Sequence, residues 1–86
     1  MNIREIYKAT PQQIKSEADR LLRELLKRVT LSEVHTLTGI SRTTLYKWSD
    51  EDRPVSSWGE RDAAWFVLIC GTNPAIVKVL RRKVKA

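Results

Sequence analysis

Five side chains that can form hydrogen bonds fall within six consecutive residues: Arg42, Thr43, Thr44, Tyr46 and Lys47. Arginine carries a fork of N–H donors that matches the O6 and N7 acceptors on the edge of guanine. Threonine offers its hydroxyl group to several bases and its methyl group to thymine. The chemistry available to this run is therefore recognition of base edges and phosphates by hydrogen bonding and charge.

Two short helices joined by a glycine turn would position these side chains. Thr30 and Glu33 have the spacing of a capping box, which predicts that the first helix begins about Leu31. Val34 and Leu37 then point inward at helical spacing, so one face of this helix belongs to the core.

The second helix follows directly after the turn. Gly39 falls where the first helix must end, and glycine enters the left-handed backbone region without a Cβ penalty. Ile40 would plug the turn into the core, and Ser41 would cap the second helix, predicted over about residues 41–49. Leu45 and Trp48 would anchor this helix, which leaves its hydrogen-bonding side chains on the other faces.

The residues from Val34 to Trp48 follow the pattern Val-x-x-x-x-Gly-Ile-Ser-x-x-x-Leu-x-x-Trp, which resembles the helix-turn-helix of phage and bacterial regulators of the lac-repressor type. In size the chain is similar to a phage Cro or repressor. The run Gly-Ile-Ser-Arg-Thr-Thr-Leu-Tyr-Lys also resembles the DNA-binding end of serine recombinases. The resemblance implies that the second helix enters the major groove of double-stranded DNA by its N-terminal residues.

Individual residues of the motif take roles by this resemblance. Arg42 and Thr43 would read bases, and Lys47, one turn later, would read a base or take a phosphate. The residues expected to contact the DNA backbone through hydroxyl groups are Ser32, Thr44 and Tyr46. For Thr30 and Ser41, capping a helix is favoured over a contact with the backbone.

His35 departs from the pattern of that family, which usually has alanine four residues before the turn glycine because the two helices approach closely there. A histidine at this position predicts a wider crossing of the helices or a ring directed outward beside their interface. Three roles stay open for His35: a tolerated packing residue, a pH sensor or a phosphate contact.

A long helix is expected before the motif. Thr10 would cap it, and Pro11 would take the first helical position, where a missing N–H costs nothing. One apolar stripe follows at three- and four-residue spacing, made of Ile14, Ala18, Leu21, Leu22, Leu25, Leu26 and Val29. Most charges between them should form a solvated face with i,i+4 pairs. A short helix over residues 2–9 is also expected.

A polar loop over residues 49–56 should lead to another helix. Ser57 and Glu60 have capping-box spacing, which predicts a helix from there to about Cys70, with Gly71 as a left-handed stop.

Residues 63–70 of that helix are apolar on every face. Either the other helices wrap them completely, or part of the segment, including Trp65 or Phe66, forms a homodimer interface. Trp58 is expected to act as a lid on the core, and Cys70 to be an inert core residue.

Asn73 and Pro74 repeat the cap-plus-proline signal and predict a last helix from Ala75 to about Lys85. Its cations are Lys78, Arg81, Arg82, Lys83 and Lys85, with no acid among the last nine residues. Cations in a last turn interact favourably with the helix dipole. Five exceed what the dipole requires, so Arg81, Arg82 and Lys83 are candidates for auxiliary contacts with DNA phosphates.

The length of the chain predicts one small domain, residues 1–86. Helical spacing throughout, with no strand-like alternation, predicts an all-α bundle of about five helices that contains the helix-turn-helix. The 86 residues carry a net charge of +6 and a pI of about 9.9, with 42% hydrophobic residues, which suits a folded protein with a polyanionic partner. One cysteine and one histidine argue against a metal or cofactor site. No signal peptide or membrane span is expected, and the lone cysteine favours the cytoplasm of a bacterial host cell or its nucleoid.

Three functions fit these features. The first is a sequence-specific transcriptional regulator of double-stranded DNA, similar to Cro or a repressor. The second is an excisionase-like recombination accessory or architectural protein that bends DNA, although the sequence lacks an obvious wing hairpin. The third is a protein-interaction module that docks through the helix containing residues 63–70. An enzyme is the poorest fit, because the chain has no glycine-rich phosphate loop and no paired buried carboxylates.

Overall fold

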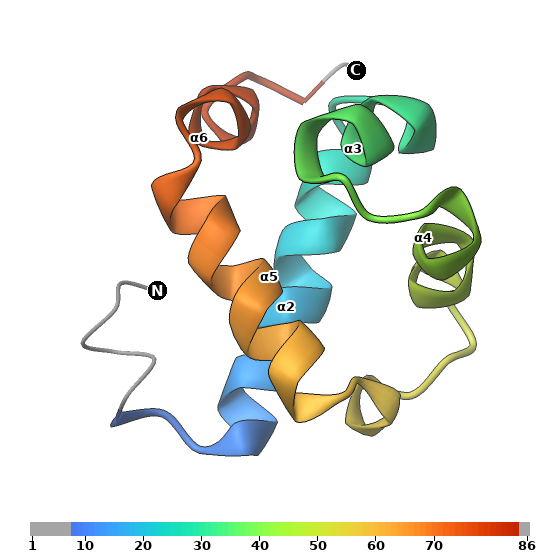
Figure 1. Cartoon of the computed structure of the whole chain (residues 1–86), viewed down its shortest axis with the longest axis vertical. Coiled ribbons are helices and arrows are strands. Elements are labelled where there is room, and N and C mark those ends of the chain that lie inside the picture. The colour runs from blue at the N-terminus through green and yellow to red at the C-terminus, as the bar shows by residue number, and fades with distance from the viewer. Residues whose placement is uncertain (1–7, 85–86) are drawn as a thin grey trace.

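Five α-helices and one 3-10 turn make up residues 8–84, the part of the chain that the computed structural model describes, and this range contains no strand (Figure 1). The elements are α2 (Pro11–Leu26), α3 (Leu31–Thr38), α4 (Arg42–Ser49), the 3-10 turn η1 (Val55–Ser57), α5 (Glu60–Thr72) and α6 (Pro74–Leu80). The predicted all-α class is confirmed. The short helix expected over residues 2–9 falls mostly outside the described residues.

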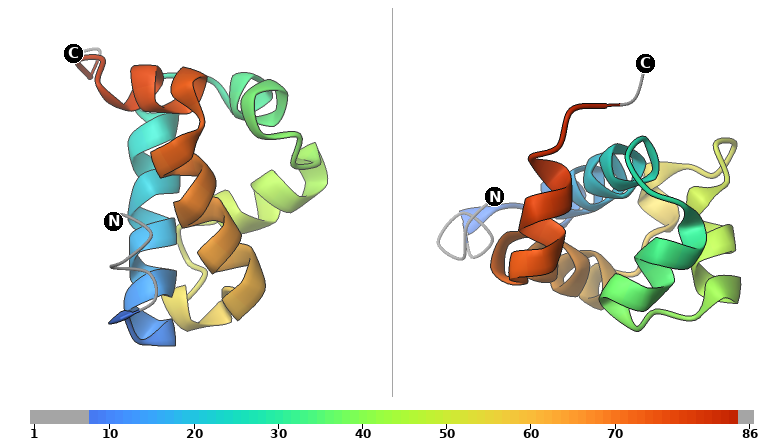
Figure 2. Two further views of the ribbon diagram at one scale, coloured as in Figure 1. Left: turned by 60° about the vertical axis from the view of Figure 1, so that its left-hand side comes forward. Right: turned by 90° about the horizontal axis from the view of Figure 1, so that it is seen from above.

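The pair α2 and α5 forms the centre of the fold, with α3 and α4 on one side of it and α6 at the end of α5 (Figures 1 and 2). The centre of the core is formed by the side chains of these two helices that are least exposed to solvent: Ala18, Leu22, Leu25, Ala63, Phe66 and Val67. Burial of apolar side chains on both helices supplies the main favourable free energy of folding, and α3 and α4 both contact α2.

The start of α2 agrees with the sequence. The Thr10 hydroxyl accepts a hydrogen bond from the Gln13 N–H at 3.2 Å, and the Gln13 side chain accepts from the Thr10 N–H at 2.9 Å. This reciprocal pair is a complete capping box, and Pro11 occupies the first helical position. The helix ends at Leu26, and Val29 packs against the core from the following loop.

The predicted capping box at Ser57 is wrong. Ser57 ends the 3-10 turn, where its hydroxyl donates to the Pro54 carbonyl at 2.6 Å and accepts from Arg53 Nε at 2.5 Å. The turn delivers the next residue, Trp58, into the core with 2% of its surface exposed. Helix α5 therefore begins only after Gly59, without a side-chain cap.

The predicted stop at Gly71 is also wrong, because α5 continues through it to Thr72. Asn73 ends α5 and caps α6, and its Oδ1 accepts hydrogen bonds from the N–H groups of Ala75 and Ile76 at 3.0 and 3.3 Å. Proline disfavours the helical conformation in the residue before it, so Pro74 sets the turn at Asn73. The two helices are bent by 84° there.

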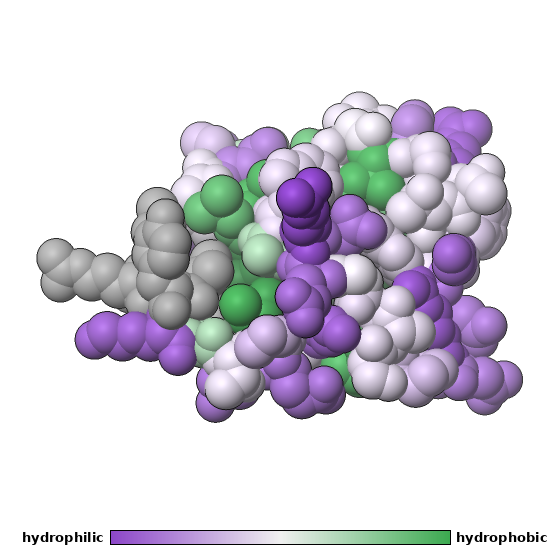
Figure 3. Space-filling view, turned by 60° about the horizontal axis from the view of Figure 1, so that its bottom comes forward, coloured by the Kyte–Doolittle hydropathy of each residue, from purple (hydrophilic) through white to green (hydrophobic). Residues whose placement is uncertain are grey.

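Helix α5 is wrapped on one face only. Ala63, Phe66, Val67 and Cys70 are buried, whereas Trp65 is 44% and Leu68 37% exposed. On the face shown in Figure 3, hydrophobic atoms lie in separate patches with hydrophilic side chains between them. Burial raises the pKa of the Cys70 thiol to about 12, so this thiol stays protonated near neutral pH, as expected of an inert core residue.

No single helix within residues 8–84 is long and apolar enough to cross a bilayer. Only α5 and α6 taken together reach the required length and composition, and they are bent at Asn73.

Three aromatic rings join the two sides of the core. The ring centroids of Trp48 and Trp58 lie 4.5 Å apart, and Phe66 lies 6.0 Å from Trp48 and 5.8 Å from Trp58. The indole N–H of Trp58 donates to Asp19 Oδ1 at 3.4 Å, so its polar atom has a partner on α2. Trp58 is thus a central core residue rather than the lid that we expected.

Replacing Trp58 by alanine should lower the free energy of unfolding by about 3–5 kcal/mol, because it removes a buried ring and leaves a cavity. Urea denaturation followed by circular dichroism measures the loss. Trp65→Ala is the matched control, since this tryptophan is 44% exposed and does not belong to the cluster of Trp48, Trp58 and Phe66. Equal losses for the two variants would contradict the role given to the cluster.

Candidate nucleic-acid interface

The first helix of the motif begins where its cap predicts. The Thr30 hydroxyl accepts a hydrogen bond from the Glu33 N–H at 3.2 Å, which is the hydroxyl half of the predicted capping box. Val34 is fully buried, and Leu31 and Leu37 pack against the core from the same helix. The inward face predicted for α3 is confirmed.

Gly39 makes the turn between α3 and α4. Its φ of +75° is the one left-handed value in the described residues, and its N–H donates to the His35 carbonyl at 2.9 Å. No atom lies within 4 Å of the position that a Cβ would take. Glycine is needed here for its backbone conformation alone, because space for a methyl group is available.

Two side chains of α3 hold the turn, and neither was expected from the sequence to have this role. The Thr38 hydroxyl donates to the Val34 carbonyl at 2.7 Å and accepts from the Ile40 N–H at 3.2 Å. His35 Nδ1 lies 2.5 Å from the Ile40 carbonyl. A carbonyl only accepts, so Nδ1 carries the hydrogen. His35 is therefore a partly buried residue that holds the turn through the Ile40 carbonyl, and only the geometry of the turn shows this role.

Helix α4 separates its side chains into two groups. Leu45 is fully buried and Trp48 is 6% exposed, so the helix is seated on this side. Four other side chains are exposed and sit at i,i+4 spacing in two pairs, which brings them to one side of the helix: Arg42, Thr43, Tyr46 and Lys47. We call these four residues the exposed strip of α4.

Hydroxyl groups flank the exposed strip. Ser41 Oγ caps α4 by accepting from the Thr44 N–H at 3.2 Å and donates to Thr44 Oγ1 at 2.8 Å. Thr44 Oγ1 thus keeps its own hydrogen for another acceptor. Ser32 is exposed on the first turn of α3. Of the three residues expected to contact the DNA backbone, Thr44 lies on α4, Ser32 lies on α3, and Tyr46 belongs to the exposed strip of α4.

Three acidic residues follow α4 immediately. Asp50, Glu51 and Asp52 are exposed, and Asp50 Oδ1 accepts from the Asp52 N–H at 3.0 Å. The cations Arg42 and Lys47 lie on the helix itself. The charge is therefore positive on the exposed strip of α4 and negative just beyond the C-terminal end of the helix. The strip attracts a polyanion, and residues 50–52 repel it.

The predicted basic helix over residues 75–85 is wrong in its second half. Helix α6 ends at Leu80, and Arg81, Arg82 and Lys83 lie beyond it as exposed residues of a turn, a bend and an irregular segment. Lys85 lies outside the described residues. In neither view of Figure 2 does this end of the chain run alongside α4.

Arg28, just after α2, holds the segment that follows α6. Its Nε donates to the Arg82 carbonyl at 2.8 Å, and its Nη1 donates to the Glu24 carbonyl and carboxylate at 2.7 and 2.9 Å. The hydrogen bonds from Arg28 and then Lys27 lower the pKa of Glu24, which keeps this carboxylate charged. Arg82 also lines a hollow with Glu33 and Thr36, so the segment lies beside α3.

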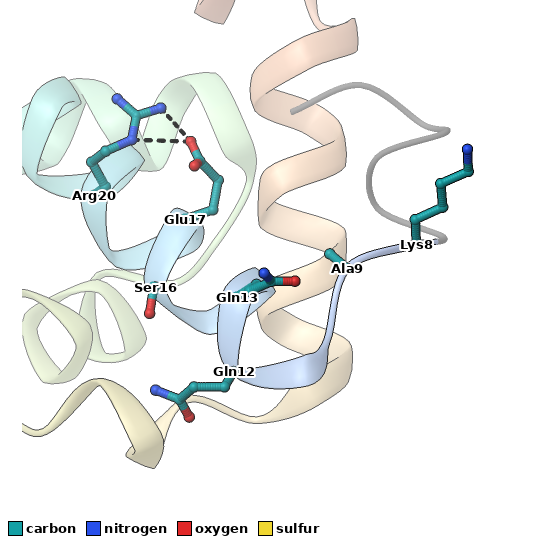
Figure 4. Close-up of a pocket in the computed structure, with 7 residues that line it drawn as sticks. All are labelled: Lys8, Ala9, Gln12, Gln13, Ser16, Glu17 and Arg20. Carbon is teal, nitrogen blue, oxygen red and sulfur yellow. Dashed lines mark hydrogen bonds and ion pairs between the residues drawn. The ribbon is translucent and has the colours of Figure 1, made fainter.

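Other features of the surface carry no assignment. A shallow hollow of about 590 Å³ lies against the first turns of α2, where Arg20 and Glu17 pair with each other (Figure 4). Because each charge of this pair satisfies the other, neither is directed at a ligand. Within residues 8–84, no three histidine, cysteine or carboxylate side chains gather in a way that could hold a metal ion.

Comparisons with protein-family models, with curated proteins and with solved structures found no match.

Replacing Gly39 by alanine should lower the free energy of unfolding by about 1–2 kcal/mol, the cost of holding a residue with a Cβ in the left-handed region. Gly39→Asn should lose less, since asparagine tolerates this conformation better. Thermal unfolding of the two variants tests this. A loss of several kcal/mol for both would contradict it, because that would require a steric clash where the surroundings are open.

Proposed function

We propose that this protein is a sequence-specific regulator that binds double-stranded DNA through α4 in the major groove. The observation that carries the proposal is the division of α4 into a buried side, Leu45 and Trp48, and an exposed strip. An eight-residue helix that is seated on its apolar side and free on its polar side has the donors and the shape that readout of base edges requires.

The charges of the molecule support one orientation of α4 on DNA. The chain carries a net charge of +6, and the acidic residues 50–52 follow the C-terminal end of α4. Phosphates would repel that end, so the N-terminal residues of α4 would enter the groove first. In this orientation Arg42, Thr43 and Lys47 reach base edges, while Ser32 and Thr44 donate to phosphates on either side.

The basic segment after α6 supports a second contact. Arg81, Arg82 and Lys83 are exposed, and Arg82 lines a hollow with residues of α3, the helix that crosses the DNA backbone in helix-turn-helix docking. These cations would contribute affinity without sequence preference.

Two alternatives lead to different measurements. An architectural or recombination accessory protein would bend its bound site, which a circular-permutation gel assay detects. A protein-interaction module would enrich no DNA in a selection from random duplexes.

A second copy of the chain remains a predicted partner. Trp65 and Leu68 are the exposed apolar residues of α5 that would contact it, and sedimentation of free and DNA-bound protein would detect the dimer. We further propose that the protein acts in the cytoplasm or nucleoid of a bacterial cell.

Arg42→Ala should weaken binding to the selected DNA by about 1–3 kcal/mol and relax the preference at one base pair, because a bidentate contact to a base edge is lost. Selection of bound duplexes from random sequence supplies the site, and fluorescence anisotropy measures the affinity. The control is Arg61→Ala, which removes another exposed arginine, at the start of α5. Unchanged affinity and preference in Arg42→Ala would reject the proposed role of α4.

Replacing Arg81, Arg82 and Lys83 together by alanine should flatten the salt dependence of DNA binding. Each phosphate contact contributes about −0.9 to the slope of log K against log salt concentration, so three lost contacts would change it by about 2.7. The preferred sequence should not change. Measuring affinity over a series of salt concentrations tests this, and a slope equal to that of the unmodified protein would exclude the basic segment from the interface.

A further inference from the structure

Tyr46 is the most exposed of the large apolar side chains on the described surface. It is 67% exposed, compared with 44% for Trp65, 37% for Leu68 and 46% for Val84. Scattered exposed apolar residues are ordinary in soluble proteins, so exposure alone carries no function. Its position on α4 is the informative feature.

The rotation of α4 groups Tyr46 with two of the expected base readers, Thr43 and Lys47, while Arg42 lies about 90° from the line opposite the buried side. Successive residues of a helix are rotated by about 100° around its axis. Measured from the direction directly opposite the midpoint of Leu45 and Trp48, Thr43 lies about 10° away, and Tyr46 and Lys47 each lie about 50° away. Thr44 lies about 110° from this direction, on the flank of the helix. A helix seated by Leu45 and Trp48 therefore presents Tyr46 to the groove floor as directly as Lys47, and presents Thr44 to the groove wall, where the phosphates are.

The groove floor offers one apolar group to such a ring. Base edges in the major groove carry donors and acceptors, and among the unmodified bases only thymine adds a methyl group, at C5. An aromatic ring with a polar tip can cover that methyl with its edge or face and keep its hydroxyl hydrated. Thr44 already supplies a hydroxyl group with a free hydrogen on the flank of α4.

From this geometry we propose that the ring of Tyr46 packs on the C5-methyl group of a thymine and makes Tyr46 a specificity-determining residue. The proposal rests on the proposed function, since it requires α4 in the major groove. It replaces the hydroxyl-to-phosphate contact that we expected for this side chain.

The test combines protein variants with modified DNA. In the duplex selected from random sequence, each thymine in turn is replaced by deoxyuridine, which pairs identically but lacks the methyl group. One such replacement should weaken binding of the unmodified protein and of Tyr46→Phe about fourfold, the worth of one buried methyl group. Tyr46→Ala should bind the thymine duplex more weakly and should not distinguish thymine from deoxyuridine.

Two results would overturn this proposal while leaving the proposed function intact. One is a Tyr46→Phe variant as weak as Tyr46→Ala with a flatter salt slope, which would assign the hydroxyl to a phosphate. The other is a deoxyuridine effect of equal size in all three proteins, which would assign the methyl contact to another residue. Failure of Arg42→Ala to alter binding, or selection of no duplex, would reject both proposals together.

Discussion

The contact between Trp48 and Trp58 is the interaction on which the rest of the structure depends. Trp48 belongs to α4, and Trp58 connects the 3-10 turn to α5, so this ring pair joins α4 to the centre of the fold. Phe66 closes the group from α5, and Asp19 of α2 accepts the indole N–H of Trp58. Because interiors are close-packed, rings held on several sides resist rotation, and the direction of α4 is fixed with them.

The turn before α4 adds a second constraint that acts over a few residues. Gly39 reverses the chain, while Thr38 and His35 hold Ile40 through its N–H and its carbonyl. Ile40 is thereby fixed between two helices whose apolar sides face the same core. The turn sets the angle at which α4 leaves α3, and the aromatic rings set its rotation about its own axis. Together they leave one side of α4 free, which is what a helix that reads a surface needs.

Features that depend on neighbours in the sequence could be predicted, whereas features that depend on distant contacts could not. The caps at Thr10, Thr30 and Ser41 and the left-handed Gly39 are local, and all four are present. Ser57 carries an equally good local cap signal, but burial of Trp58 outweighs the one hydrogen bond that a cap supplies. Likewise the exposed strip followed from helical spacing, while the roles of Thr38 and His35 required the turn itself.

The end of α6 illustrates how such a distant contact changes a functional argument. A helix continued to residue 85 would have carried its cations away from the domain along a straight axis. The helix instead stops at Leu80, and Arg28 holds the Arg82 carbonyl from 54 residues earlier in the chain. Arg28 precedes Thr30, the cap of α3, by two residues. The Arg82 backbone is therefore held beside the residues that lead into α3, rather than at the end of a helix that continues past Leu80.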